Sequence, residues 1–262
     1  MSEREPLMRV KNVSKTFTDG TEPSAILKNV SLDVYPEDFL CILGPSGCGK
    51  TTLMRCVAGF ERFEGTIELN GEPVSKPSAD RMMVFQDFNQ LFHWKTVRQN
   101  VLFPLEHLKK GTKAEIQARA DEALEKVKLS KYADFYPHQL SGGMKQRVAI
   151  AKALALRPQI ILMDEPFASL DAMTRRHLQK ELLRVKEEEK LTVIFVTHSI
   201  QEAITLSNRV IVMSDFGTID INEPNPLPKP VTPASEGYAE LWAKYNRAIG
   251  FDEEEERMDT AA

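Results

Sequence analysis

Two kinds of hydrophobic pattern run along the chain and predict two kinds of strand. Residues 7–17 and 26–34 alternate apolar with polar side chains, which is typical of antiparallel strands with one face in water. Four shorter runs are almost continuously apolar, as in parallel strands that are buried on both faces: 39–44, 160–164, 192–198 and 210–214.

Helical periodicity fills the intervals between these strands. Residues 50–60 read as a helix directly after the first apolar run, and 97–156 read as mostly helical, with 114–129 the clearest amphipathic segment. A helical pattern at 174–189 separates two of the later strands. Strands that alternate with helices predict a parallel α/β core, and the long helical stretch predicts an insert within it.

Residues 222–262 have a different composition. Residues 222–233 form a proline-rich connector. Beyond it, apolar residues recur at helical spacing and predict a short helix that Gly250 ends: Tyr238, Leu241, Trp242, Tyr245 and Ile249. Such a helix either docks on its own domain or serves regulation. The acidic residues 252–262 are typical of a solvated, disordered end.

Composition excludes several classes of protein. The net charge is −4, and residues 252–262 contribute six acids and one base, or −5, so the rest is near −4 + 5 = +1. That balance gives no basic surface for nucleic acid. No apolar run approaches the ~18 residues of a membrane span, so any membrane path belongs to other chains. Cys41, Cys48 and Cys56 lack metal spacing and indicate reduced thiols.

A glycine-rich loop, "GPSGCGKT", joins the strand at 39–44 to the helix that follows. In that context, backbone N–H groups turn inward around a phosphate at a helix N-terminus. The Lys50 ammonium suits the β- and γ-phosphates of ATP, and the Thr51 hydroxyl is a Mg²⁺ ligand. The predicted nucleotide-binding residues here are Gly44, Pro45, Ser46, Gly47, Cys48, Gly49, Lys50, Thr51 and Thr52.

Polar residues at the ends of three strands complete a candidate site. Asp164 ends an apolar strand, where ligands of parallel sheets bind, and suits a direct or indirect contact to Mg²⁺. Glu165 follows as the candidate to activate a water, although an acidic pair can also simply cap a helix. Gln86 can ligate a metal and orient a water, and His198 can hold the γ-phosphate. A single Gln or His at a strand end more often has a structural role, but the coincidence of Gln86 and His198 with the other elements favours a role in the site.

A second glycine turn, "HQLSGGMKQR", precedes another predicted helix but has no lysine of its own. Together with the features above, it makes the chain resemble the ATP-binding subunits of ABC transporters. The family motifs stand in order over about residues 7–215: "GPSGCGKT", "VFQD", "LSGGM", "ILMDEP", "ASLD" and "VTH". The resemblance implies a P-loop NTPase (RecA-like) α/β core, an antiparallel β subdomain and a helical subdomain that bears the signature.

The resemblance also implies roles for residues. Ser141, Gly142 and Gly143 would contact the γ-phosphate of ATP held by a second copy of the chain, in a head-to-tail dimer. Asp171 would communicate between the two sites. Phe17 falls where the family stacks an aromatic ring on adenine, and a core phenylalanine is the equal alternative. Glu165, His198 and Gln86 would be catalytic, and Thr51, Gln86 and Asp164 would hold Mg²⁺.

A finer similarity links the segment 84–101 and Met144 to importers for nitrate, sulfonates and taurine. It implies an importer subunit on the cytoplasmic face of the membrane, with two permease subunits and an extracytoplasmic substrate-binding protein. Phe92-His93, Asp38 and "LSNR" depart from that pattern. Phe92 and Trp94 lie where the family receives the permease, or are ordinary core aromatics.

These features predict an ATP-binding domain over 1–221, with a helical subdomain at about 88–156, followed by the connector, helix and tail of 222–262. An exporter or membrane-remodelling ATPase is the alternative function. Repair ATPases place long coiled coils between the glycine-rich phosphate loop and the signature motif "LSGGM". Here the end of the loop at Thr51 and the start of the signature at Leu140 are only 140 − 51 = 89 positions apart. Ribosomal types carry two cassettes, and a small-molecule kinase does not explain "LSGGM".

Overall fold

The computed structural model describes residues 5–18, 23–86, 90–215 and 217–250. The chain divides into two compact units: Met1–Pro77 with Thr192–Ala262, and Ser78–Leu191. The acidic end predicted at 252–262 lies outside the described residues. Within the described residues, no helix combines the length and apolar character that a membrane span requires.

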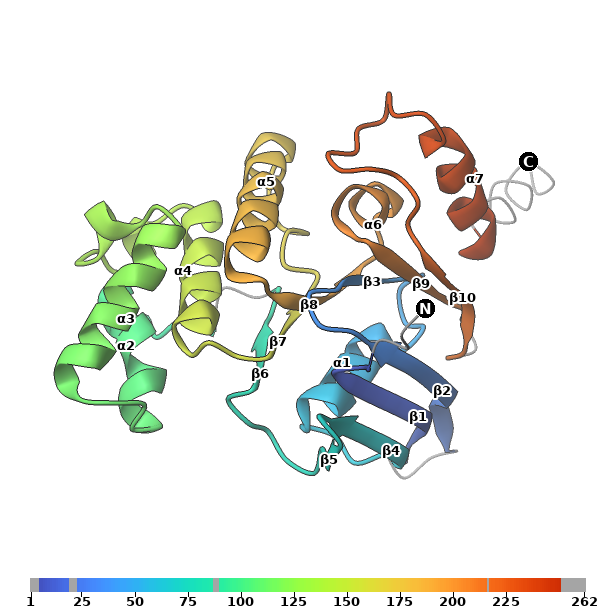
Figure 1. Cartoon of the computed structure of the whole chain (residues 1–262), viewed down its shortest axis with the longest axis horizontal. Coiled ribbons are helices and arrows are strands. Elements are labelled where there is room, and N and C mark those ends of the chain that lie inside the picture. The colour runs from blue at the N-terminus through green and yellow to red at the C-terminus, as the bar shows by residue number, and fades with distance from the viewer. Residues whose placement is uncertain (1–4, 19–22, 87–89, 216, 251–262) are drawn as a thin grey trace. The chain divides into compact units, whose positions relative to one another are not determined.

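The first unit contains an antiparallel sheet in the order β2-β1-β4-β5, near the bottom of Figure 1. Its strands are β1 (Met8–Phe17), β2 (Ser24–Val34), β4 (Glu64–Leu69) and β5 (Glu72–Pro73). In β1, Met8 and Val10 are buried while Arg9 and Lys11 are exposed, which confirms the predicted alternation.

The same unit contains three parallel neighbours, β9 (Arg209–Met213), β3 (Phe39–Leu43) and β8 (Thr192–Thr197), with β10 (Ile219–Pro224) antiparallel beside β9. Every residue of β3 and β8 is buried, as their continuous apolar runs predict. α1 (Lys50–Ala58) follows β3, and α6 (Ile200–Leu206) follows β8. The connector predicted from residue 222 is wrong at its start, because residues 222–224 still pair within β10.

The predicted C-terminal helix exists as α7 (Tyr238–Ala248) and packs against α6 within the first unit (Figure 1). Tyr245 is fully buried, and its hydroxyl donates a hydrogen bond of 3.1 Å to Glu223 Oε1. The helix therefore docks on its own unit. Trp242, one of the apolar residues at helical spacing, is 42% exposed.

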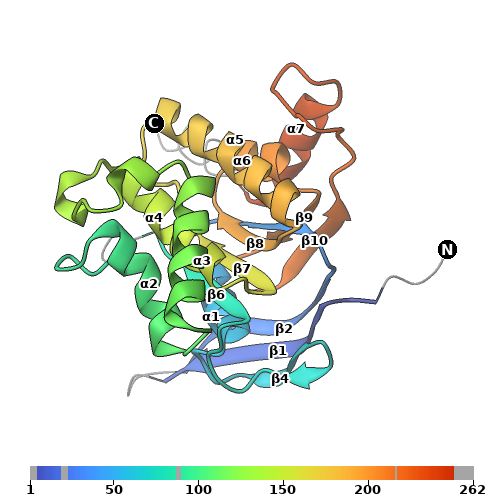
Figure 2. The same cartoon turned by 60° about the vertical axis from the view of Figure 1, so that its left-hand side comes forward.

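The described residues of the second unit form a parallel pair, β6 (Arg81–Val84) and β7 (Ile160–Asp164), and four α-helices. Those helices are α2 (Val97–His107), α3 (Lys113–Lys126), α4 (Gly142–Ala155) and α5 (Ala172–Glu189). Capping boxes begin α2 at Thr96 and α3 at Thr112. In each box the threonine hydroxyl accepts the backbone N–H of the residue three positions later, and the side chain of that residue accepts the threonine N–H. α2, α3 and α4 pack together, as Figure 2 shows.

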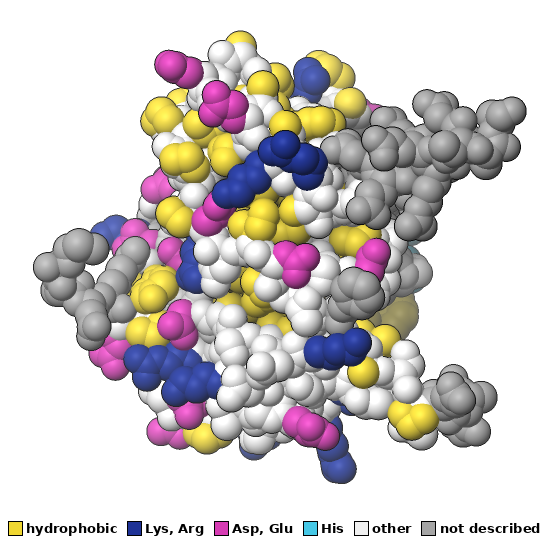
Figure 3. Space-filling model, turned by 90° about the vertical axis from the view of Figure 1, so that its right-hand side faces the viewer, with side chains coloured by type: hydrophobic (Ala, Val, Ile, Leu, Met, Phe, Trp, Pro, Cys, Tyr) yellow, Lys and Arg dark blue, Asp and Glu magenta, His cyan; other side chains and the backbone are white. Residues whose placement is uncertain are grey.

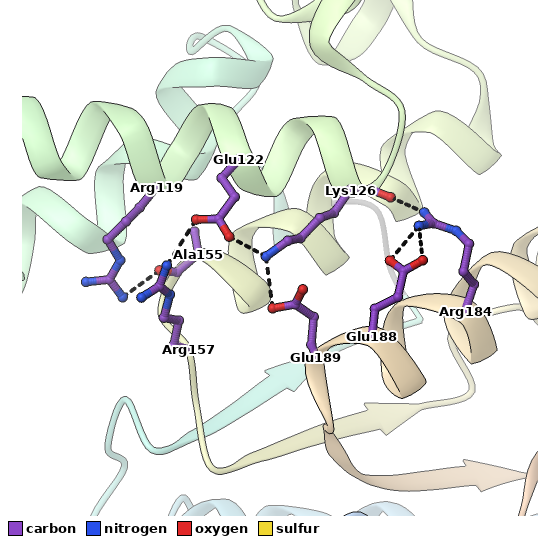
Figure 4. Close-up of polar contacts among 8 residues, drawn as sticks. All are labelled: Arg119, Glu122, Lys126, Ala155, Arg157, Arg184, Glu188 and Glu189. Atoms are coloured by element: carbon purple, nitrogen blue, oxygen red, sulfur yellow. Dashed lines mark hydrogen bonds and ion pairs between the residues drawn. The ribbon is translucent and has the colours of Figure 1, made fainter.

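Ion pairs and hydrogen bonds link α3 to α5 and to the end of α4 within this unit (Figure 4). Lys126 pairs with Glu122 on its own helix and with Glu189 on α5, at 2.9 Å for the second pair. Arg184 on α5 donates to the backbone carbonyl of Lys126, at 2.6 Å. That carbonyl lies in the last turn of α3, where intrahelical partners are lacking, so α5 caps α3.

Candidate functional site

The glycine-rich loop lies between β3 and α1 and is shaped by close backbone approaches. Gly49 has φ +100°, and a Cβ there would lie 2.8 Å from the carbonyl oxygen of Ile26. A Cβ on Gly44 would lie 2.6 Å from the carbonyl oxygen of Met213. Both positions therefore require glycine. A glycine-rich loop at a helix N-terminus can turn its backbone N–H groups toward a bound phosphate.

Lys50 lies inside this loop and is only 4% exposed. Its ammonium donates to the carbonyl oxygen of Gly44, at 2.8 Å, and to that of Pro45. It is the first residue of α1, whose N-terminus also favours an anion. When a nucleotide binds, a phosphate oxygen can replace these carbonyl oxygens as the acceptor for the Lys50 ammonium. At the rim, Ser46, Gly47 and Thr51 are exposed, and Pro45 and Thr52 are half-buried.

Cys48 is more deeply buried than Lys50, with only 1% of the residue exposed. Burial raises the pKa of its thiol, and the nearby Lys50 ammonium, with Nζ 3.8 Å from Sγ, opposes only part of that rise. The thiol is therefore protonated near neutral pH and packs as a small apolar group.

His198 leaves the sheet at the same edge as the loop. β3 and β8 are parallel, and Leu43 pairs with Thr197, so Gly44 and His198 directly follow paired residues. The His198 side chain is exposed. The predicted convergence of these two residues at one sheet edge is present in the first unit.

Phe17 is the last residue of β1 and is 42% exposed. The Lys15 ammonium lies 4.6 Å from the centroid of its ring. The core alternative for Phe17 is therefore wrong, and an exposed ring at a strand end is available for stacking. Stacking on adenine stays a prediction.

In the second unit, Gln86, Asp164 and Glu165 gather at one edge of the parallel pair. Val84 pairs with Met163, so Gln86 and Glu165 each lie two residues past paired positions. Asp164 ends β7 and is 9% exposed, whereas Gln86 is exposed. Glu165 has φ 45°, a left-handed conformation that few residues with side chains adopt.

The second glycine turn begins α4. Ser141 is its N-cap, is exposed, and accepts a bond of 3.4 Å from the Met144 N–H. Its hydroxyl proton can still be donated elsewhere. A Cβ on Gly143 would lie 2.5 Å from Thr174 Cγ2 at the start of α5, so Gly143 lets the first turns of α4 and α5 touch, while Gly142 is half-buried.

Asp171 caps α5, whose first turn lies beside that of α4. Its Oδ1 accepts the N–H groups of Thr174 and Met173, at 3.0 and 3.1 Å, and hydrogen bonds with Thr174 and then Met173 lower its pKa. A hollow of about 410 Å³ adjoins both helix starts, with Ser141, Gly143, Thr174, Lys128, Arg147 and His177 in its lining. Glu181 is the shared carboxylate partner of those last three side chains.

The predicted metal ligands are all oxygen donors. Among the described residues, no group of three or more histidine, cysteine or acidic side chains is arranged to hold a metal. Thr51, Gln86 and Asp164 instead offer a hydroxyl, an amide and a carboxylate, the donors that Mg²⁺ prefers when phosphates supply further ligands. Their chemistry fits Mg²⁺ bound together with a nucleotide.

The ABC transporter domain family matches residues 27–168, which is more than half of the chain. The chain belongs to this family. Its phosphate loop, its second glycine turn and its Asp164-Glu165 pair all fall within the matched residues. The fold prediction, a P-loop NTPase core with antiparallel and helical parts, is confirmed.

Several relatives resemble this ABC cassette over most of their length. An uncharacterized ABC transporter ATP-binding protein of Methanocaldococcus jannaschii is 50% identical over 208 residues, 79% of this chain and 77% of the relative. An aliphatic sulfonates import ATP-binding protein of Bacillus cereus is 43% identical, over 90% and 92% of the two chains. A nitrate import ATP-binding protein of Synechococcus elongatus is 41% identical, over 82% and 79%.

A solved structure shares both fold and sequence with the cassette. It is a dimeric, post-hydrolysis state of an ATP-binding cassette bound to ADP and Pi, with TM-score 0.74 and 35% identity over 83% of this chain and 98% of that chain. The cassette is therefore an ATP-binding ATPase that serves transport, as its motifs predict.

An aromatic cluster beyond Gln86 is partly exposed on the second unit of the cassette. Phe92 lies 5.3 Å from Trp94 and 4.7 Å from Phe103, between ring centroids. Trp94 is 71% exposed, so the core alternative is wrong for this residue. The fully buried Asn100 shapes the turn, because its amide bonds the backbone of Phe92 and neighbouring residues. Sequence reasoning missed Asn100, which carries no motif.

Proposed function

We propose that this cassette drives import of a small solute of the nitrate, sulfonate or taurine class. In this proposal two copies form a head-to-tail dimer on the cytoplasmic face of the membrane. They act beneath two permease subunits. An extracytoplasmic binding protein delivers the solute to these permease subunits. The observation that carries the substrate class is the 43% identity to a sulfonate import subunit over 90% of the chain, joined by the nitrate import relative.

The first unit supplies the groups that hold the nucleotide. The loop from Gly44 to Thr52 would cradle the phosphates with backbone N–H groups, and Lys50 would give its charge to the β- and γ-phosphates. His198, at the same sheet edge, would hold a γ-phosphate oxygen. Phe17 would stack on the adenine, which its exposed ring permits.

The second unit supplies the groups that act on the water. Glu165 would accept its proton, and Gln86, at the matching register position, would orient it. Thr51 of the first unit, Gln86 and Asp164 would hold Mg²⁺, which supplies charge neutralisation at the phosphate oxygens. The left-handed backbone of Glu165 fits a residue whose position is fixed for chemistry.

The second glycine turn would serve the partner copy's nucleotide. Ser141 and Gly143 stand at the start of α4, where the helix N-terminus favours an anionic group. Lys128 and Arg147 nearby are already paired with Glu181. A site completed by a second subunit hydrolyses ATP only when the dimer closes. Closing and reopening then moves the permeases.

The aromatic cluster of Phe92, Trp94 and Phe103 would receive the permease. Trp94 presents most of its ring to solvent, and amphipathic aromatic rings at partly exposed positions are typical anchors of protein interfaces. The cluster begins at Phe92, six residues after Gln86 in the sequence, so a short stretch of chain would link a bound permease to the proposed water-orienting residue.

A reconstituted transporter tests this function. The cassette would be assembled in proteoliposomes with a permease and a binding protein chosen from its neighbouring genes, with ATP on the cassette side. We expect ATP-dependent uptake of labelled taurine, an alkanesulfonate or nitrate. Trp94→Ala should abolish most uptake and co-purification of the permease, whereas Trp242→Ala, a matched exposed tryptophan on α7, should leave both unchanged. ATP-driven efflux, or uptake confined to another class of solute, would refute the proposal.

A further inference from the structure

Helix α6 (Ile200–Leu206) is only seven residues long, and both of its ends are held by side chains. A helix of this length is unstable alone, and its last carbonyls lack intrahelical partners. Asn225 Nδ2 donates to the Ile204 carbonyl oxygen at 2.8 Å. Lys229 Nζ donates to the same oxygen at 3.0 Å and to that of Thr205 at 2.7 Å.

Asn225 and Lys229 both belong to the connector that joins β10 to α7. Its two ends are anchored, because β10 pairs with β9 and the buried Tyr245 of α7 bonds Glu223 of β10. Figure 3 shows the molecule from the right-hand side of Figure 1, with hydrophobic side chains gathered in the upper part of that face. A fixed cation at the C-terminal end of a helix also interacts favourably with the helix dipole. The connector is thus an external C-cap for α6.

The other end of α6 holds the backbone around His198. The Thr197 hydroxyl accepts the Ser199 N–H at 3.0 Å and donates to Glu202 Oε2 at 2.6 Å. Thr197 is 1% exposed and Glu202 is 8% exposed, so this pair is shielded from water. Ser199 is in turn the N-cap of α6 and accepts the Glu202 N–H. The residues on both sides of His198 are therefore bonded to α6.

We propose that the connector positions His198 for ATP hydrolysis. Asn225 and Lys229 hold the far end of α6, and α6 holds the backbone around His198 through Thr197 and Glu202. This proposal rests on the function proposed above, in which His198 contacts the γ-phosphate. A displacement of about 1 Å in a group that positions the reacting atoms can lower a rate by about 100-fold, so loosening α6 should slow hydrolysis without removing any group that touches ATP.

The test compares variants of the full chain. Asn225→Ala/Lys229→Met removes the cap but keeps an apolar stem at residue 229. We expect kcat for ATP hydrolysis to fall about 10-fold while the Kd for ATP changes less than about twofold, because only positioning is lost. Hydrogen exchange should accelerate over 199–206. Lys229→Arg, unlike Lys229→Met, should keep kcat near the wild-type value, since arginine also donates to carbonyls.

A matched control uses residues on the two elements that flank the connector, β10 and α7. Asn222→Ala/Lys244→Met removes an asparagine and a lysine whose partners are Arg209 and Glu223, outside α6, and it should behave as wild type. Lys229→Met alone gives a milder variant in case the double variant folds poorly. If exchange over 199–206 accelerates in either cap variant while kcat stays at the wild-type level, the proposal is overturned.

His198→Ala separates this proposal from the proposed function. Wild-type kcat in His198→Ala would remove the assigned role of His198, whatever the connector does. With that role established by a loss of kcat, single-turnover rates decide the connector. We expect the cap substitutions to cause no further loss in the His198→Ala background. An equal 10-fold loss there would show that the connector acts through another group, and would overturn the proposal.

Discussion

Cys48 reports on the phosphate loop because its thiol lies beside the ammonium of Lys50. Only 1% of the residue is exposed, and burial raises the pKa of the thiol above its ordinary value. The thiolate is the form that reacts, so its small population near neutral pH limits the rate of alkylation. Alkylation of Cys48 would place a bulky group where the loop must hold phosphates.

Alkylation of Cys48 should therefore be slow near neutral pH, faster as pH rises toward the raised pKa, and should block ATP binding once complete. MgATP should protect the thiol. Peptide mapping by mass spectrometry after iodoacetamide treatment measures this, with the urea-unfolded chain as reference. Cys41, which is more strongly shielded, provides an internal control and should react more slowly. Labelling of folded Cys48 as fast as in urea, or unaffected by MgATP, would contradict the expectation.

Glu165 shows what a sequence pattern leaves out at the residue scale. The apolar run before Asp164 predicted correctly that these carboxylates leave a strand end. Nothing in "MDEP" signals the left-handed backbone of Glu165, with φ 45°. A residue before proline is ordinarily pushed toward extended conformations, so Pro166 argues against it. The conformation arises from the surrounding fold rather than from local preference.

At the scale of elements, strong patterns predicted well and weak ones did not. The continuous runs of β3, β7 and β8 and the periodicity of α3 and α5 were identified within three residues of their ends. β4 was missed, because Gly65 sits at its start with φ +94° against the bulged backbone at Asn12. The end of β10 was assigned to the connector, because Pro224 resembles a linker residue although edge strands tolerate proline.

The contact between α3 and α5 depends on side chains that no periodicity reveals. Lys126 bridges Glu122 and Glu189, and Arg184 caps the end of α3 (Figure 4). Although burial opposes it, the two carboxylates raise the pKa of Lys126, so the bridge persists at neutral pH. Each partner is partly exposed, so the network contributes modestly.

Lys126→Met should lower the free energy of unfolding by about 1 kcal/mol, because two ion pairs are lost while the apolar stem is kept. Urea denaturation measures the difference, which should shrink in high salt as screening weakens the pairs in the wild type. Lys113→Met, at the exposed first residue of the same helix, is the control and should change stability by less than about 0.5 kcal/mol. A difference that is independent of salt would indicate lost packing instead.

At the scale of the whole molecule, what matters is which nucleotide each site residue acts on: the one bound by its own chain or the one bound by the partner copy. Lys50, Glu165 and His198 are proposed to act on the nucleotide that their own chain binds, whereas Ser141 is proposed to act on the partner's. A head-to-tail dimer with this arrangement contains two sites, each built from the phosphate loop of one copy and the second glycine turn of the other. Function can then be restored by combining two different defects.

Mixing Ser141→Arg with Glu165→Gln tests this division. Each variant alone should bind ATP but hydrolyse it far more slowly than wild type, because one lacks the second glycine turn and the other lacks the base. In a mixed dimer, one site pairs an intact Glu165 with an intact Ser141. Random pairing makes half of the dimers mixed, so about a quarter of wild-type activity should return if each site works independently. ATPase assays of equimolar mixtures measure this recovery.

The matched control mixes His198→Ala with Glu165→Gln, two defects proposed to lie on the same side of each site. No pairing of these chains creates an intact site, so their mixture should stay as inactive as its components. Recovery in both mixtures would place His198 with the partner's nucleotide. Recovery in neither, with dimers detected by light scattering in the presence of ATP, would mean that Ser141 serves its own chain or that one defective site silences the other.

A chain carrying both Ser141→Arg and Glu165→Gln, mixed with wild type, separates these two explanations. If Ser141 serves its own chain, each mixed dimer keeps one intact site and activity stays near half of wild type, whereas silencing leaves only the quarter of dimers that are wholly wild type.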